Sequence, residues 1–145
     1  MDSEMISQSY AARQPVEVIR HEGKMMCMII RAEPVPGSTV FYTPDDLHVQ
    51  FGKIVYAANG KIARHRHKPK RRSIVGTSEV LVVQKGRMIL DIYADGRTIH
   101  SSREMGPGDV VILVAGGHGF RFLEDTVLLE VKQGPYHGDG EKEYF

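Results

Sequence analysis

The sequence predicts an all-β protein, folded as a sandwich or barrel. Short runs rich in Val, Ile and aromatic residues recur from Val16 onward, and glycine-rich turns separate them. One such turn, Asp95-Gly96, lies between two strand-like runs, where glycine tolerates the positive φ of a tight hairpin. The strand-like runs occupy residues 16–20, 24–32, 39–42, 47–58, 62–67, 79–83, 87–94, 97–102, 109–115, 118–124 and 126–133.

Length and composition fit one domain. The chain has 145 residues, of which 41% are hydrophobic and 26% charged, and no repeat or linker divides it. We therefore expect a flexible arm over residues 1–14 and a single domain over residues 15–145. Cys27 is the only cysteine, which excludes an internal disulfide. The amino terminus lacks the apolar core of a secretory signal, and no apolar run has the length of a membrane span, so we expect a cytoplasmic protein with no membrane partner.

A histidine pair lies in the most basic part of the chain. Arg64 to Arg72 contains six Lys or Arg residues together with His65 and His67. Residues two apart face the same side of a strand, so the two imidazoles would project together and could converge on a metal. An isolated pair of this kind often binds nothing. Whether His65 and His67 form part of a metal site therefore depends on whether further candidate ligands are present.

Two further residues are candidate partners. Glu79 alternates with Leu81 and Val83, which places its carboxylate on an inward face where it needs a partner. His118 alternates with two aromatic residues, Phe120 and Phe122, and is also expected to face the interior. The alternative for Glu79 is a carboxylate at a sheet edge, paired with a nearby Lys or Arg side chain. The alternative for His118 is a core histidine whose ring nitrogens are satisfied by hydrogen bonds.

Together these residues resemble the two motifs of the cupin superfamily. The first motif corresponds to Gly60, His65, His67, Glu79 and Gly86, and the second to Gly108, Gly116 and His118. The resemblance covers residues 47–133, with the core motifs in residues 60–122. It implies a small single-domain cupin, folded as a double-stranded β-helix, the cupin jelly-roll barrel. The metal ligands that it implies are His65, His67, Glu79 and His118.

The sequence departs from the family pattern in the spacing of the first motif. Eleven residues separate His67 from Glu79, where the common pattern has three or four, so "KPKRRSIVGTS" is expected to form a long loop. On the cupin fold this loop lies near the barrel mouth, where Arg71 and Arg72 could attract an anionic ligand. The alternative is a solvated charge run. The formal net charge of +1 and the absence of interleaved aromatic residues argue against a nucleic-acid partner.

The resemblance also implies a function. A divalent transition metal, Fe, Mn, Ni or Zn, would hold a small oxygenated ligand, and the chain looks like small cupins associated with surface-sugar biosynthesis. We expect isomerase- or epimerase-type chemistry on a sugar or sugar nucleotide, with Phe120, Phe122, Arg71 and Arg72 around the substrate. A non-catalytic sugar- or metabolite-binding cupin is the alternative, and a cupin dioxygenase is the third choice. No catalytic residue is assigned, and by analogy with cupins we expect a homodimer.

Overall fold

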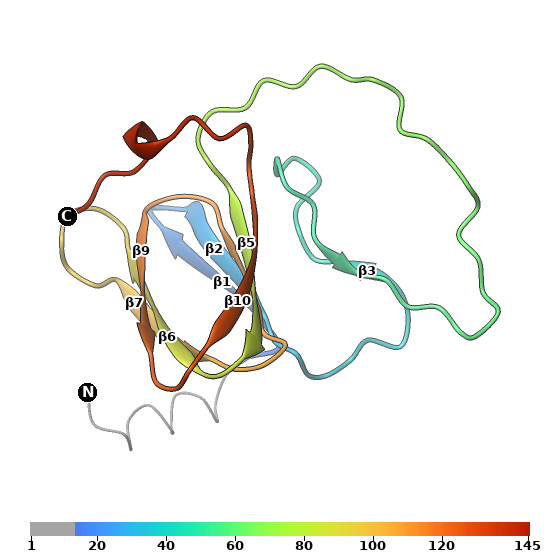
Figure 1. Ribbon diagram of the computed structural model, residues 1–145, viewed down its shortest axis with the longest axis horizontal. Coiled ribbons are helices and arrows are strands. Elements are labelled where there is room, and N and C mark those ends of the chain that lie inside the picture. The colour runs from blue at the N-terminus through green and yellow to red at the C-terminus, as the bar shows by residue number, and fades with distance from the viewer. Residues whose placement is uncertain (1–13) are drawn as a thin grey trace. The chain divides into compact units, whose positions relative to one another are not determined.

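The computed structural model describes residues 14–145, which form an all-β structure as predicted (Figure 1). This part of the chain contains no α-helix and only one short 3₁₀ helix, η1 (Asp139–Glu141). The predicted amino-terminal arm, except for Gln14, lies outside the described residues. The strands are β1 (Val16–His21), β2 (Lys24–Ile30), β3 (Val40–Phe41), β4 (Gly52–Lys53), β5 (Glu79–Lys85), β6 (Met88–Tyr93), β7 (Ser101–Met105), β8 (Val110–Leu113), β9 (Gly117–Phe122) and β10 (Val127–Lys132).

The contacts within the chain divide it into two compact units. The first, called the sandwich unit below, joins the residues up to Glu33 to Thr77–Phe145 and contains β1, β2 and β5 to β10. The second, called the hairpin unit, is Pro34–Gly76 and contains β3 and β4. No change in composition marks either boundary in the sequence.

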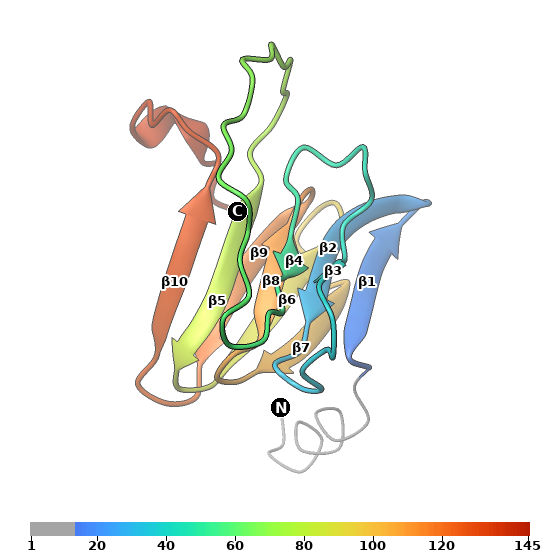
Figure 2. The same ribbon diagram turned by 90° about the vertical axis from the view of Figure 1, so that its right-hand side faces the viewer.

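The sandwich unit consists of two antiparallel sheets that enclose its core (Figures 1 and 2). Five strands form one sheet in the order β1-β2-β8-β5-β10, and three form the other in the order β7-β6-β9. The buried core is apolar and draws on both sheets: Ile19, Met26, Cys27, Ile29, Leu81, Val83, Met88, Leu90, Ile92, Met105, Val111 and Leu113.

The period of two along each strand selects the side chains that enter this core. In β5, Leu81 and Val83 are core residues, and Glu79 lies two positions before them on the same face. In β9, Phe120 packs against the core, and His118 lies two positions before it. The sequence predicted both alternations, and the register of the strands agrees with them.

Gly86 makes the tight connection between β5 and β6. Its φ is +90°, a region that residues with a side chain rarely adopt. A Cβ atom there would lie 2.3 Å from the carbonyl oxygen of Asp125 and 2.8 Å from the Cα of Thr126. Glycine is therefore required at this position both by the backbone angle and by the close approach of a neighbouring loop.

A buried carboxylate closes the turn between β7 and β8. Asp109 accepts hydrogen bonds from the backbone N–H groups of Gly106, at 3.0 Å, and Ala32, at 2.8 Å. The Arg31 guanidinium donates to the Asp109 carboxylate at 3.2 Å and to the backbone carbonyl of Glu104 at 2.8 Å. This network ties the end of β2 to the turn before β8, where both strands enter the five-stranded sheet.

The predicted β6–β7 hairpin is present, but its loop is longer than the sequence suggested. The strands pair antiparallel, and Gly96 has a positive φ of 69° as expected of the Asp95-Gly96 turn. However, β7 begins at Ser101 and not at Arg97. The His100 N–H donates to the Ile92 carbonyl at 2.7 Å, and the residues between Tyr93 and His100 form the loop.

The hairpin unit is organised around the short β3–β4 pair, whose two strands run antiparallel. Thr43 stabilises it: its hydroxyl accepts a hydrogen bond from the Phe51 N–H at 3.0 Å and donates to Gln50 Oε1 at 3.1 Å. Regular pairing covers only Val40–Phe41 and Gly52–Lys53. The strand predicted over residues 47–58 is therefore reduced to two residues.

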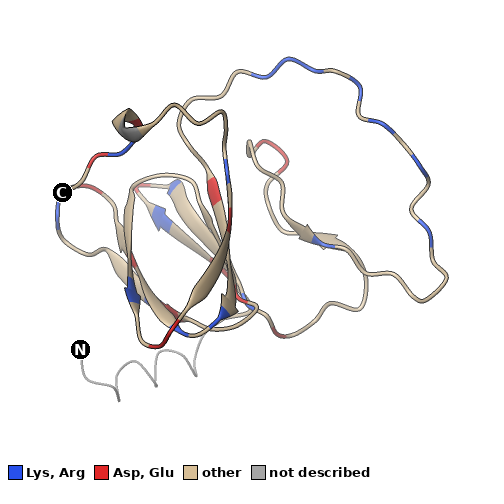
Figure 3. Ribbon diagram, viewed as in Figure 1, with Lys and Arg blue, Asp and Glu red and all other residues tan. Residues whose placement is uncertain are grey.

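The prediction of a strand at residues 62–67 is wrong. From Ile54 to Gly76 the chain is extended or turning but pairs with no strand, and every residue of 61–72 is exposed. In Figure 3, several stretches of the ribbon in this segment are coloured as Lys or Arg. The alternation in "IARHRH" is between two kinds of polar residue, so it creates no apolar face to bury, and Pro69 cannot donate to a ladder.

Candidate functional site

A cavity of about 550 Å³ lies within the sandwich unit, beside the start of β5 and the start of β9. Its wall combines charged, hydroxyl and aromatic side chains with the glycine-rich segment before β9. The lining residues are Thr77, Glu79, Tyr93, Leu113, Val114, Ala115, Gly116, Gly117, His118, Gly119, Phe120, Lys132, Glu141, Lys142, Glu143, Tyr144 and Phe145. A volume of this size is typical of sites for small-molecule ligands.

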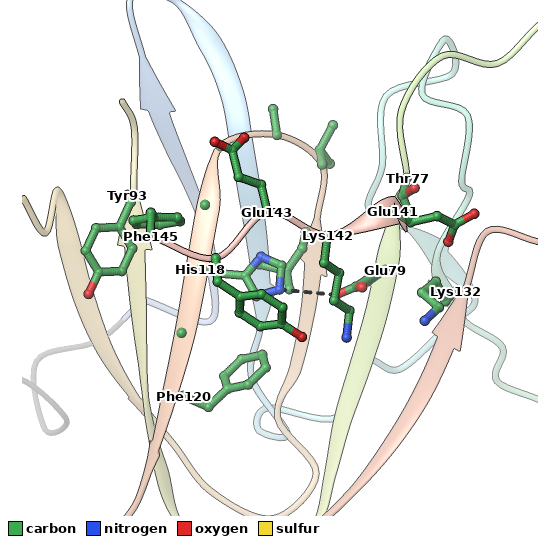
Figure 4. Close-up of a pocket in the computed structure, with 17 residues that line it drawn as sticks. Thr77, Glu79, Tyr93, His118, Phe120, Lys132, Glu141, Lys142, Glu143 and Phe145 are labelled. Carbon is green, nitrogen blue, oxygen red and sulfur yellow. Dashed lines mark ion pairs between the residues drawn. The ribbon is translucent and has the colours of Figure 1, made fainter. Parts of the chain in front are cut away.

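Two of the predicted site residues meet in this cavity. His118 Nε2 lies 3.3 Å from Glu79 Oε2, and Figure 4 shows the ring and the carboxylate pointing toward one another. The Glu79 side chain is 14% exposed and that of His118 is 31% exposed, so both are sheltered but can be reached from solvent. The pair can exchange a proton, bind a hydroxyl group or ligate a cation.

The two side chains come from opposite sheets. Glu79 is the first residue of β5, where it pairs with Leu113 of β8 and Lys132 of β10. His118 belongs to β9 and pairs with Ile92 of β6. Both point inward at the end of the sandwich where the apolar core stops, and this position leaves space for a ligand.

Phe120 and Phe122 have different environments although they share a strand. Phe120 lines the cavity, packs on the core, and lies with its ring centroid 5.6 Å from that of His118. Phe122 is 57% exposed and is not part of the cavity wall. Only the first of these two residues therefore lies where it can touch a ligand bound beside His118.

The carboxy-terminal residues Glu141–Phe145 form one wall of the cavity. The Phe145 ring packs edge-on against Tyr93, with centroids 5.1 Å apart and an interplanar angle of 83° (Figure 4). Gly117 permits this contact, since a Cβ atom there would lie 2.7 Å from the Phe145 ring. Sequence reasoning missed this wall, because the tail has no periodic pattern and its partners are distant in the chain.

Charged groups of both signs surround the Glu79–His118 pair. Lys132 and Lys142 supply ammonium groups, and Glu141 and Glu143 supply carboxylates. Lys132 Nζ also lies 5.8 Å from the centre of the Tyr136 ring, a cation–π contact. The cavity thus offers hydrogen-bonding groups and charges of both signs to a polar ligand.

The other predicted site residues belong to the hairpin unit. The His65 and His67 rings lie with centroids 5.3 Å apart, and His65 Nδ1 lies 2.8 Å from the carbonyl oxygen of Ala63. Arg71 and Arg72 are exposed. Across residues 14–145, no three or more His, Cys, Asp or Glu side chains are placed together as a metal site. The predicted four-ligand centre therefore stays a prediction.

Comparison of the chain with protein-family models, with curated proteins and with solved structures gives no match. In the described part of the chain, no helix has the length and apolar character needed to cross a bilayer.

Proposed function

We propose that the sandwich unit is a cupin-type barrel whose cavity binds a divalent transition metal and a small oxygenated metabolite. The metal ligands in this proposal are Glu79 and His118, together with the two histidines that the sequence resemblance adds, His65 and His67. The observation that carries the proposal is the approach of His118 Nε2 to Glu79 Oε2 inside a cavity of ligand size.

The distance between these two atoms fits two ligands of one ion. Nitrogen and oxygen ligands lie about 2.0–2.2 Å from zinc, so neighbouring ligands are about 2.8–3.6 Å apart in octahedral or tetrahedral geometry. The observed separation is 3.3 Å. The donor types, imidazole nitrogen and carboxylate oxygen, suit Fe, Mn, Ni and Zn alike.

A hydrogen bond between His65 and the backbone also suits metal binding by this residue. When Nδ1 carries the proton, it donates to the Ala63 carbonyl at 2.8 Å, and the lone pair of Nε2 is left for a metal. Histidine ligands usually make this kind of hydrogen bond through their second nitrogen, because it fixes the tautomer and the orientation of the ring.

The lining supports a sugar or sugar nucleotide as the ligand. Tyr93 and Phe120 offer apolar surface, while Lys132 and Lys142 offer positive charge for a carboxylate, phosphate or pyrophosphate. A bound metal would polarise a carbonyl group and so assist isomerase- or epimerase-type chemistry. His118 and Glu79 would hold the metal at the cavity wall, and the tail wall would shield the site from water.

Metal content tests the proposal. Protein purified without a histidine tag should carry a divalent metal, measured by mass spectrometry of the digested sample. The variants Glu79→Gln and His118→Asn, and the double variant His65→Ala/His67→Ala, should each lose most of it. His100→Ala removes an exposed histidine that does not line the cavity and should keep the metal of the parent protein. A parent with no more metal than the double variant would contradict the proposal.

A second experiment separates an enzyme from a non-catalytic binding protein. Sugar nucleotides that raise the melting temperature bind the folded protein, and NMR spectra of the same mixtures report turnover. A ligand that stabilises the protein and is never converted would favour the binding module. If the basic segment contributes, Arg71→Glu/Arg72→Glu should weaken anionic ligands more at low than at high salt, whereas unchanged affinity would assign these residues to a solvated surface.

A further inference from the structure

The hairpin unit carries a concentration of positive charge that the rest of the chain lacks. Residues 47–78 contain eight Lys or Arg residues and no Asp or Glu (Figure 3). The unit as a whole, Pro34–Gly76, has these eight cations and two carboxylates, a formal charge of +6, whereas the formal net charge of the chain is +1. The remaining residues therefore sum to −5, so charges of opposite sign predominate in the two units.

Most of these cations lie on an exposed segment. Every residue of 61–72 is exposed, and none belongs to a strand or a helix. The rings of its two histidines lie edge-on with centroids 5.3 Å apart, as side chains two positions apart on one side of an extended chain do. In the same alternation, Arg64 and Arg66 lie on the opposite side together with Ile62. One side of the segment thus presents cations beside an aliphatic side chain.

Exposed apolar side chains accompany the cations of the hairpin unit. Ile54 is 59% exposed, Tyr56 and Ile62 are each 56% exposed, and Val75 is 93% exposed. Segments that bind membrane surfaces combine apolar side chains, which enter the interface, with Lys and Arg, which attract anionic headgroups. A nucleic acid would contact the cations through phosphates that give these side chains no apolar environment, and no Phe, Tyr or Trp lies within 61–72 to stack on bases.

We propose that the hairpin unit binds peripherally to the surface of an anionic lipid bilayer. Its Arg side chains bind headgroup phosphates through paired hydrogen bonds, and Ile62 and Val75 enter the interface. Because the rest of the chain is net negative, the bilayer attracts this unit and repels the remainder, which orients the protein. The sequence predicted no membrane partner because no apolar run could span a bilayer, but binding at the surface requires no such run. The proposal does not rest on the metal or the ligand proposed for the sandwich unit.

Cosedimentation with vesicles tests the role of the cations. The parent protein should bind vesicles of phosphatidylcholine and phosphatidylserine at low salt, dissociate as salt rises, and bind little to phosphatidylcholine alone. Each Lys or Arg near an anionic surface raises the partition coefficient about fivefold, so Arg64→Gln/Arg66→Gln should lower it about 25-fold. Arg20→Gln/Arg97→Gln removes two exposed cations of the sandwich unit and should bind like the parent. Equal binding of the parent to both kinds of vesicle would overturn the proposal, as would an Arg64→Gln/Arg66→Gln variant that binds like this control.

Val75→Ser distinguishes a bilayer from other polyanions. It should weaken binding to the phosphatidylserine vesicles several-fold at every salt concentration, because salt does not screen the insertion of an apolar side chain. Val131→Ser makes the same change at a position of the sandwich unit that is 68% exposed, and should bind like the parent. Duplex DNA and polyglutamate, added in turn as competitors, report the alternative partners. Tighter binding to either competitor than to the vesicles, or vesicle binding by Val75→Ser equal to that of Val131→Ser, would overturn the proposal.

Discussion

Asp91 and Arg121 bind each other through two hydrogen bonds across β6 and β9. Arg121 Nε donates to Asp91 Oδ2 at 2.6 Å, and Arg121 Nη2 donates to Asp91 Oδ1 at 2.8 Å. Ser102 of β7 donates to the same carboxylate at 2.6 Å. The Asp91 side chain is nearly buried, so this cluster connects all three strands of the smaller sheet.

The Asp91–Arg121 pair predicts a dependence of stability on pH. The hydrogen bonds from Arg121, helped by Ser102, lower the pKa of Asp91 in the folded protein, although burial opposes them. The stabilisation is therefore present above the pKa of aspartate in the unfolded chain, about 3.9, and is lost as the pH falls through the lower pKa of the folded state. Asp91→Asn should reduce the free energy of unfolding by about 1–2 kcal/mol at pH 7, a modest value because the Arg121 side chain is 46% exposed.

Urea unfolding from pH 7 to pH 2 measures this effect. The difference between parent and Asp91→Asn should shrink below about pH 4, where Asp91 becomes protonated first in the unfolded chain and, at lower pH, in the folded protein. Asp125→Asn changes an exposed aspartate and should follow the parent curve at every pH. A difference between parent and Asp91→Asn that is constant down to pH 2 would show that the charge of Asp91 is not the cause.

Asp109→Ala should be among the most destabilising single substitutions in the sandwich unit. It removes the acceptor of two backbone N–H groups and the carboxylate beside the buried Arg31 guanidinium. Removal of one partner of a buried ion pair costs about 3–5 kcal/mol. Chemical denaturation should show this loss, and Asp125→Ala, at an exposed position, should change the unfolding free energy by less than about 0.5 kcal/mol. Equal effects of the two substitutions would contradict the structural role of Asp109.

Two glycines with positive φ provide a matched comparison of backbone strain and steric conflict. Gly86→Ala introduces a methyl group against the backbone of Asp125 and Thr126, while Gly96→Ala meets no atom within 4 Å. The second substitution should cost only the strain of a positive φ, about 1 kcal/mol. The first should cost clearly more, because the loop before β10 must move. Thermal unfolding of both variants measures the two losses of stability. Equal losses for Gly86→Ala and Gly96→Ala would mean that the turn at Gly86 is less crowded than the structure indicates.

Phe145→Ala should loosen the tail wall of the cavity. The edge-on contact between the Phe145 and Tyr93 rings contributes about 0.5–1.5 kcal/mol, which corresponds to a change of about 2- to 10-fold in the opening equilibrium. Hydrogen exchange of the amides in residues 141–144 should accelerate by this factor, while exchange in β9 stays as in the parent. Tyr144→Ala, at a largely exposed position, is the control. Unchanged exchange in the Phe145 variant would mean that other contacts hold the tail.

The sequence was most informative where apolar and polar residues alternate. Leu81 and Val83 predict which face of β5 points inward, and Glu79 lies on that same face. In β9, Phe120 predicts in the same way that His118 points inward. The same reasoning was misleading at His65 and His67, because alternation between histidine and arginine has the period of a strand without its apolar face. Residue spacing within a strand thus predicted two inward-facing site residues, Glu79 and His118, and their meeting across the sheets comes from the structure.

The carboxy-terminal wall shows the limit of sequence reasoning. Tyr93 and Phe145 are brought together by the path of the chain after β10, and their contact depends on the missing side chain of Gly117. Neither residue has a partner at a regular spacing. Long-range contacts of this kind follow from tertiary packing, which local pattern does not encode.

The sandwich unit is built from two stretches of chain that are far apart in the sequence. Its β1–β2 hairpin is separated from β5 by the hairpin unit, which includes the exposed, unpaired and lysine- and arginine-rich residues 61–72. Limited trypsin digestion should therefore cleave there first, and the amino-terminal fragment should remain bound through the pairing of β2 with β8. The two fragments would migrate together in a native gel and separate in detergent, so the protein could be reconstituted from two independently expressed pieces.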